Sequence, residues 1–119
     1  MTHDMTQDTE THPLLAVSAL DGRYRGKVRD LSKVVSEYGL MRYRVLVEVR
    51  WFAHLAEQPG IPEVAPLSSQ QASALDGIAA DFTLVDAERI KEIEGVTNHD
   101  VKAVEYFVKE RLAGIEGLS

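Results

Sequence analysis

Residues 38–58 read YGLMRYRVLVEVRWFAHLAEQ, and this stretch decides the fold class. An alternation typical of a β-strand runs through Tyr43, Val45, Val47, Val49 and Trp51, with Arg42, Arg44, Glu48 and Arg50 between them. The same stretch also carries helical spacing, in one row at Leu40, Tyr43, Val47, Trp51 and Leu55 and a second at Val45, Val49, Phe52 and Ala56. Strands rarely exceed about 10 residues, and no turn residue lies between Leu40 and Gln58. Length therefore favours one long helix, ended by Pro59 and Gly60.

Shorter helical patterns flank the long helix. Apolar residues at helical spacing precede it at Val28, Leu31, Val34 and Val35. Ser68 with Gln71 forms a capping box for a following helix, and Thr83 can cap the next. Gly95 should end that helix, and a last one should open at Thr97 or Asn98. The sequence predicts an all-α chain of four or five helices, with residues 14–119 as one helical domain.

Composition limits the function classes. The chain has 119 residues, a net charge of −6 and no cysteine. The charge argues against a non-specific nucleic-acid binder, and the missing thiols exclude disulfides and cysteine nucleophiles. No run reaches the roughly 20 apolar residues that a membrane span needs. Residues 1–13 contain nothing to bury and should form a disordered tail. We expect a soluble, cytoplasmic protein without a membrane partner.

Two apolar rows on one long helix exceed what the shorter helices can cover. One row should stay partly exposed, and exposed apolar surface of this kind marks an interface. Partner chains or a further part of the protein would cover it. Arg44 and Glu48 on this helix are spaced to pair.

The first candidate site is the turn at residues 21–26, DGRYRG. The paired N–H groups of an arginine guanidinium match the oxygens of a phosphate or carboxylate, and glycines let backbone N–H groups approach an anion. From composition alone, a solvated basic turn is the simpler interpretation.

The second candidate is residues 97–100, TNHD, at a predicted helix start. Capping accounts for Thr97, Asn98 and Asp100. It does not account for His99, whose charged form the positive end of a helix disfavours, so a neutral imidazole is expected. The histidines lack metal-ligand spacing, which argues against a metal site. Tyr106 and Phe107 could be a stacking platform, but an aromatic pair beside an apolar stripe is usually core.

Three blocks in register resemble the adenylosuccinate lyases: residues 16–24 (AVSALDGRY), residues 36–40 with 44–51 (SEYGL and RVLVEVRW), and residues 97–107 (TNHDVKAVEYF). The resemblance implies the helical N-terminal domain of the fumarase/aspartase-type lyase fold, without that fold's central long-helix bundle. It implies that Arg23 and Tyr24 bind the nucleotide, chiefly its phosphate. It also implies that Asn98, His99 and Asp100 bind the part being eliminated, with His99 orienting the substrate.

The family reaction is a β-elimination that releases fumarate from adenylosuccinate, and from the related succinyl-carboxamide imidazole ribotide, without metal or organic cofactor. Its catalytic histidine and serine loop follow the segment seen here, so this chain alone should hold no catalytic acid or base and be inactive. The family assembles as homotetramers. Two alternatives remain open: a stand-alone helical module that binds nucleotide or partner chains, and a sister lyase of the superfamily.

Overall fold

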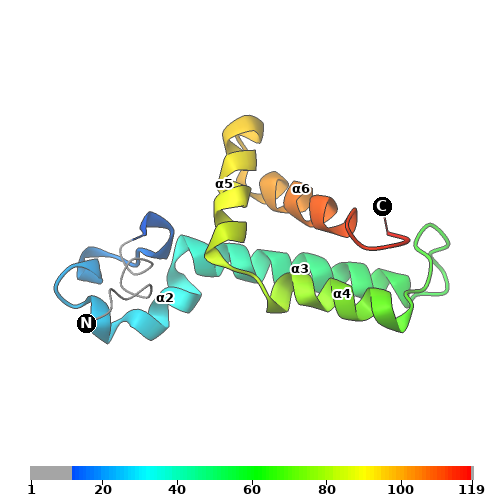
Figure 1. Cartoon of the computed structure of the whole chain (residues 1–119), viewed down its shortest axis with the longest axis horizontal. Coiled ribbons are helices and arrows are strands. Elements are labelled where there is room, and N and C mark those ends of the chain that lie inside the picture. The colour runs from blue at the N-terminus through cyan, green and yellow to red at the C-terminus, as the bar shows by residue number, and fades with distance from the viewer. Residues whose placement is uncertain (1–11, 119) are drawn as a thin grey trace. The chain divides into compact units, whose positions relative to one another are not determined.

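The computed structural model describes residues 12–118, and every regular element in that range is helical (Figure 1). The predicted all-α class is confirmed. The chain divides into two compact units, Met1–Arg42 and Tyr43–Ser119. Most of the predicted disordered tail, residues 1–11, lies outside the described residues. Its last two residues take part in the first helical turn, where the His12 imidazole accepts a hydrogen bond from the Leu14 N–H.

The first unit is built from short elements. Three 3-10 helices, Pro13–Leu15, Ala19–Asp21 and Arg25–Lys27, precede helix α2, Arg29–Val35. The Asp21 carboxylate accepts from the N–H groups of Val17 and Ser18, which folds the chain back on itself before the basic turn. Asp21 therefore has a structural role in shaping the segment that presents the turn.

A sharp break separates α2 from the long helix α3, Glu37–Ala56, and it occurs at Ser36. Ser36 is 1% exposed, and its hydroxyl accepts from the Gly39 N–H at 3.1 Å. The same hydroxyl donates to the Ser32 carbonyl. An added Cβ at Gly39 would lie 2.7 Å from the carbonyl carbon of Val34. Only glycine lets the end of α2 pass this close to α3.

Replacing Gly39 with alanine should therefore destabilise the α2–α3 junction by about 1–3 kcal/mol, because backbone rather than a flexible side chain must move. Urea unfolding followed by circular dichroism measures the loss. Gly95→Ala is the matched control: it lies inside α5, Leu84–Thr97, with nothing within 4 Å of an added Cβ. That control should be neutral or gain up to about 1 kcal/mol from helix propensity. An equal response of the two variants would contradict the close approach at Gly39.

The second unit packs the remainder of α3 with α4, Ser69–Ala80, α5, and α6, Asp100–Leu112. The predicted capping box of Ser68 with Gln71 forms, and the predicted cap Thr83 forms a second box with Asp86. The α3 side of this core uses the second predicted row, with Val45 0% and Val49 1% exposed. The long-helix prediction is thus confirmed, and the strand-like alternation belongs to a helix.

Helices α5 and α6 form the tightest pair. Ile90 of α5 and Val104 of α6 are each 1% exposed. Phe107 lies edge-on to Phe82, with ring centroids 5.9 Å apart. Two ion pairs join the helices outside this core, Arg89 with Glu110 and Arg111 with Asp86. Tyr106 departs from the predicted core pair, because it is 44% exposed while Phe107 is 1% exposed.

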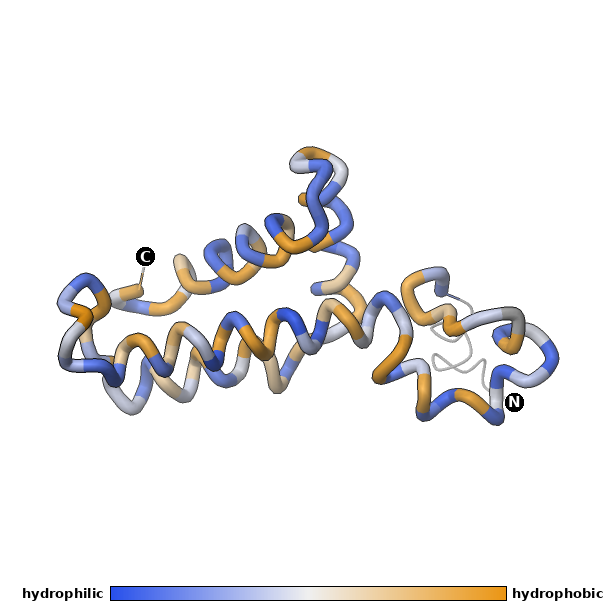
Figure 2. The backbone as a smooth tube through the Cα atoms, turned by 180° about the vertical axis from the view of Figure 1, so that it is seen from behind, coloured by the Kyte–Doolittle hydropathy of each residue, from blue (hydrophilic) through white to orange (hydrophobic). Residues whose placement is uncertain are grey.

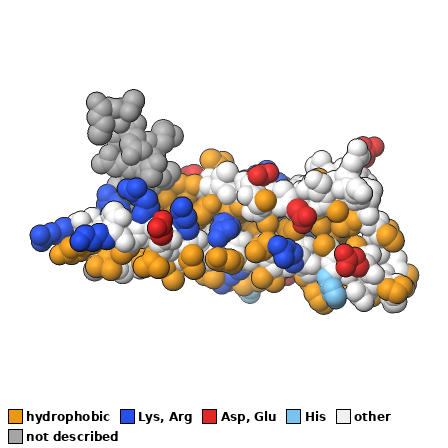
Figure 3. Space-filling model, turned by 90° about the horizontal axis from the view of Figure 1, so that it is seen from below, with side chains coloured by type: hydrophobic (Ala, Val, Ile, Leu, Met, Phe, Trp, Pro, Cys, Tyr) orange, Lys and Arg blue, Asp and Glu red, His pale blue; other side chains and the backbone are white. Residues whose placement is uncertain are grey.

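The first apolar row of α3 stays exposed, as predicted. In the second unit, Tyr43 is 41%, Val47 65% and Trp51 57% exposed. Figure 2 shows hydrophobic and hydrophilic turns alternating along α3, and Figure 3 shows hydrophobic side chains spread over one face. The Trp51 ring stacks on His54, with centroids 5.9 Å apart. We call Tyr43, Val47 and Trp51 the exposed α3 row.

Candidate functional site

Arg23 and Tyr24 lie in the turn between the second and third 3-10 helices, and both are exposed. The guanidinium carbon of Arg23 lies 5.5 Å from the centroid of the Tyr24 ring, a cation–π contact that aligns the two side chains. The Gly22 carbonyl accepts from the Arg25 N–H at 3.2 Å, which closes the turn. The turn thus presents a guanidinium and a phenol together.

The two glycines of this turn have no packing reason for being glycine. An added Cβ at Gly22 or Gly26 would meet nothing within 4 Å, and neither has a positive φ. Five cations gather over this part of the chain, at Arg23, Arg25, Lys27, Arg29 and Lys33, against Asp21 and Asp30. A locally basic turn with open backbone is suited to an anion.

The second set of predicted residues lies where α5 passes into α6. Helix α5 does not end at Gly95 as predicted but continues to Thr97. Asn98 follows in the left-handed conformation, with φ of 53°, and its N–H donates to the Glu94 carbonyl at 2.8 Å. Asparagine adopts this conformation more readily than most residues. The backbone conformation alone therefore explains why asparagine stands at position 98. It ends α5, whereas the sequence predicted that it starts α6.

His99 caps α6, and the prediction that Thr97 or Asn98 does so is wrong. The His99 Nδ1 accepts the Lys102 N–H at 3.1 Å. The Thr97 hydroxyl accepts from the His99 N–H and donates to the His99 carbonyl, which fixes the backbone of the cap residue. The sequence pattern missed this because histidine is seldom counted among N-cap residues, which are mostly serine, threonine, aspartate and asparagine.

Asp100 is the first residue of α6 and is tied to α3. Its carboxylate lies 3.1 Å from Arg44 Nη1, so Arg44 pairs with Asp100 and not with Glu48 as predicted. The Asp100 carboxylate also accepts its neighbour's N–H, from Val101, at 2.8 Å. That hydrogen bond is the main reason why the pKa of Asp100 falls below its usual value, and Arg44 adds to it. Sequence spacing alone gave no signal for Arg44, because its partner lies 56 residues away.

The lowered pKa of Asp100 predicts an acid-dependent loss of stability. A carboxyl with a lower pKa in the folded chain than in the unfolded one stabilises the fold above about pH 4, and this contribution disappears as pH falls through the folded-state pKa. The difference in urea midpoint between the natural chain and Asp100→Asn should thus be larger at pH 7 than at pH 3. Asp76→Asn, on exposed α4 surface, controls for the change in net charge. A difference independent of pH would contradict the lowered pKa of Asp100.

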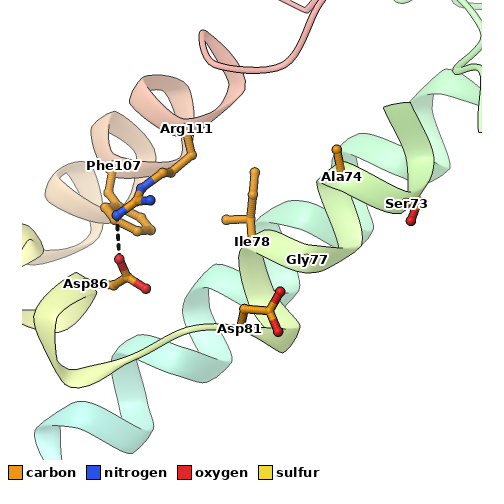
Figure 4. Close-up of a pocket in the computed structure, with 8 residues that line it drawn as sticks. All are labelled: Ser73, Ala74, Gly77, Ile78, Asp81, Asp86, Phe107 and Arg111. Carbon is orange, nitrogen blue, oxygen red and sulfur yellow. Dashed lines mark hydrogen bonds and ion pairs between the residues drawn. The ribbon is translucent and has the colours of Figure 1, made fainter. Parts of the chain in front are cut away.

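A cavity of about 400 Å³ lies elsewhere in the second unit, between α4 and α6 (Figure 4). Ile78 points into it from α4, and Arg111 and Phe107 line it from α6. Arg111 is held there by the Asp86 carboxylate, with its guanidinium carbon 5.0 Å from the Phe107 ring centroid. None of the five predicted site residues lines this cavity, and two of its charged groups, Asp86 and Arg111, pair with each other.

Two further features concern residues 12–118 only. No group of three or more histidine and carboxylate side chains there is placed to hold a metal ion. No helix in the same range has the length and apolar character to cross a membrane.

Comparison with known proteins identifies the relatives. The chain is 59% identical over 99 residues to an adenylosuccinate lyase of Haemophilus influenzae, an alignment covering 83% of the chain. It is 52% identical over 109 residues to that of Escherichia coli, and 42% over 111 residues to that of Dictyostelium discoideum. The chain is a homologue of one segment of the adenylosuccinate lyases. It spans 22% to 24% of the length of these three relatives. No model of a protein family matches it.

The predicted resemblance to adenylosuccinate lyases is confirmed by these identities. The predicted site residues fall into two sets that belong to different units, Arg23 and Tyr24 in the first and Asn98, His99 and Asp100 in the second. Each set is exposed. Both sets therefore present their side chains to solvent in the structure.

Proposed function

We propose that this chain is the substrate-binding segment of an adenylosuccinate lyase, an enzyme that eliminates fumarate from adenylosuccinate to give AMP. The observation that carries the proposal is identity of 51% to 59% with three lyases of that name, over 83% to 92% of the chain. The same activity would act on the succinyl-carboxamide imidazole ribotide, and the reaction would take place in the cytoplasm.

Arg23 and Tyr24 bind the phosphate of the nucleotide in this proposal. A guanidinium offers paired N–H donors that match two phosphate oxygens, and a phenol adds a third donor. Their exposure and mutual contact support the assignment, since both polar ends face solvent in the same turn. The open backbone at Gly22 and Gly26 leaves space for the anion to approach.

Asn98, His99 and Asp100 bind the succinyl part. Their side chains are exposed at the α5–α6 junction, where the backbone is fixed by the Thr97 hydroxyl and the Asn98 N–H. Arg44 fixes one member of this group, because its guanidinium donates a hydrogen bond to the Asp100 carboxylate. A substrate group reaching this junction would meet an amide, an imidazole and a carboxylate held by one short segment.

The elimination itself requires a base that removes the proton next to a carboxylate and an acid that protonates the departing nitrogen. We assign neither to this chain, and a homotetramer of the longer enzyme would supply both. Positive groups around the substrate carboxylate stabilise the carbanion-like intermediate, so no metal or organic cofactor is required.

The exposed α3 row supports the proposal that further protein covers this segment. Three large apolar side chains in a row, each more than 40% exposed, are costly to leave in water. The relatives are about four times longer than the aligned segment, since it spans 22% to 24% of them. We assign the row to the remaining part of the lyase or to its partner subunits.

The test is an absorbance assay of adenylosuccinate cleavage with two purified samples, the 119-residue chain and the full-length protein that contains it. The full-length protein should release fumarate, and the isolated chain should not. Turnover by the isolated chain would overturn the proposal that the acid and base lie outside this chain. A folded full-length protein that leaves adenylosuccinate intact would overturn the proposed activity.

A stand-alone interaction module is the second candidate function, and the exposed α3 row is the observation that favours it. The length of the encoding reading frame distinguishes the enzyme from the interaction module. A frame that continues well past Ser119 supports the enzyme, and one that stops there supports the module.

A further inference from the structure

The Asp100 carboxylate is held by two groups that come from different helices. Its Oδ1 accepts the Val101 N–H at 2.8 Å, within α6 itself. Its Oδ2 accepts from Arg44 Nη1 at 3.1 Å, and Arg44 belongs to α3. Each oxygen therefore has one described partner and keeps a further lone pair, because a carboxylate offers about four acceptor positions. The carboxylate is thus oriented and still able to accept a hydrogen bond from a ligand.

The two helices joined by this contact are both anchored in the core of the second unit. Val45, next to Arg44 on α3, and Ala103, one turn after Asp100 on α6, are each 0% exposed. The guanidinium therefore bridges two fixed points. The Arg44 side chain is 29% exposed and that of Asp100 57%. Ion pairs with this much exposure usually add little to stability, because water weakens the attraction. Stability alone is a weak reason for the contact.

The charge of Asp100 needs compensation if this junction binds the succinyl part of the substrate. A succinyl group carries two carboxylates, and an uncompensated carboxylate at Asp100 would repel them. Lys102, in the first turn of α6, pairs instead with Glu105 at 2.8 Å. The Arg44 guanidinium is thus the cation that the structure places against Asp100.

We infer that Arg44 is a positioning residue for the substrate, which acts through Asp100 by fixing the direction of its carboxylate and cancelling its charge. This inference rests on the proposed lyase function and deepens it. Asp100 then serves as a hydrogen-bond acceptor and not as a free negative charge beside the succinyl carboxylates. Arg44 contributes to substrate binding, so its loss should raise KM and leave kcat nearly unchanged.

Steady-state kinetics of the full-length protein with adenylosuccinate tests the role. Arg44→Ala should raise KM roughly tenfold and change kcat by less than about threefold. Arg44→Lys keeps the charge and should restore most of the loss, whereas the uncharged Arg44→Gln should not. Arg50→Ala is the matched control, since Arg50 is an exposed arginine on the same helix, and it should leave KM and kcat unchanged. Melting temperatures verify that every variant is folded.

A double-mutant cycle shows whether Arg44 acts through Asp100. Asp100→Asn should itself raise KM, and adding Arg44→Ala should raise it further by less than about threefold, because the carboxylate on which Arg44 acts is gone. A full tenfold rise in that background would overturn the positioning role. An unchanged KM in Arg44→Ala, or an equal rise in Arg50→Ala, would overturn it as well. These results require an enzyme that cleaves adenylosuccinate, and an unmodified protein that does not cleave it would instead overturn the proposed function.

Discussion

Arg23→Ala in the full-length protein should weaken AMP binding by roughly 10- to 100-fold. A hydrogen bond to a charged group is worth about 1.5–3 kcal/mol, and each 1.4 kcal/mol is about tenfold in affinity. Arg23 is exposed, and its described contact is the cation–π pair with Tyr24. Removing its guanidinium should therefore leave the fold unchanged. Isothermal titration with AMP measures the effect.

Lys27→Ala is the matched control for Arg23→Ala. Lys27 is exposed, ends the third 3-10 helix and contributes the same single charge. It should change the affinity by only a few-fold, because it acts through long-range attraction that salt screens. Equal weakening in both variants would show that general positive charge, not the guanidinium of Arg23, attracts the phosphate. Unchanged affinity in Arg23→Ala would remove Arg23 from the site.

Phe107→Ala should cost the isolated chain about 3–5 kcal/mol of stability. Phe107 is 1% exposed, packs edge-on against Phe82 and supports the Arg111 guanidinium. Its removal leaves a cavity where α6 meets the end of α4, next to the space already present there. Because small domains have only about 5–15 kcal/mol in total, a large share of the fold's stability depends on this ring. Urea unfolding followed by circular dichroism measures the loss.

Tyr106→Ala is the comparison, since Tyr106 is adjacent, aromatic and 44% exposed. It should cost less than about 1 kcal/mol, in the range typical of surface positions. Phe107→Leu keeps most of the volume and should fall between the two, which gives a folded variant if Phe107→Ala does not fold. Similar losses for Tyr106→Ala and Phe107→Ala would contradict the packing of α6.

The long helix could be predicted because length settles an ambiguity that alternation leaves open. Residues 43–51 fit both periods, and the absence of a turn residue between Leu40 and Gln58 favours a helix over a strand of that length. The capping boxes at Ser68 and Thr83 were predictable for a different reason, since each is a local pattern within four residues. The break at Ser36 was not predictable in this way, because it depends on Gly39 approaching the end of another helix.

The α5–α6 junction shows where sequence reasoning fails. Glycine commonly ends a helix, yet α5 continues past Gly95. Asn98, three residues later, takes the left-handed conformation that ends it. The favourable cap residues at Thr97 and Asn98 then lie inside and at the end of α5, and His99 caps α6. Local preferences alone gave the wrong boundaries here, because the register between two helices joined so closely depends on their packing. The pairing of Arg44 with Asp100 could not be predicted from the sequence, because the two residues are 56 positions apart and meet only in the folded chain.

The most direct test of the account is a chimera with the Escherichia coli adenylosuccinate lyase, to which the chain is 52% identical over 109 residues. The aligned segment of that enzyme is replaced by this chain, and fumarate release from adenylosuccinate is measured. We predict that the chimera cleaves adenylosuccinate within about tenfold of the unmodified enzyme, since about 1.4 kcal/mol of transition-state stabilisation corresponds to that factor, and that Arg23→Ala weakens its binding of AMP. A chimera that folds and assembles like the unmodified enzyme but releases no fumarate would contradict the account.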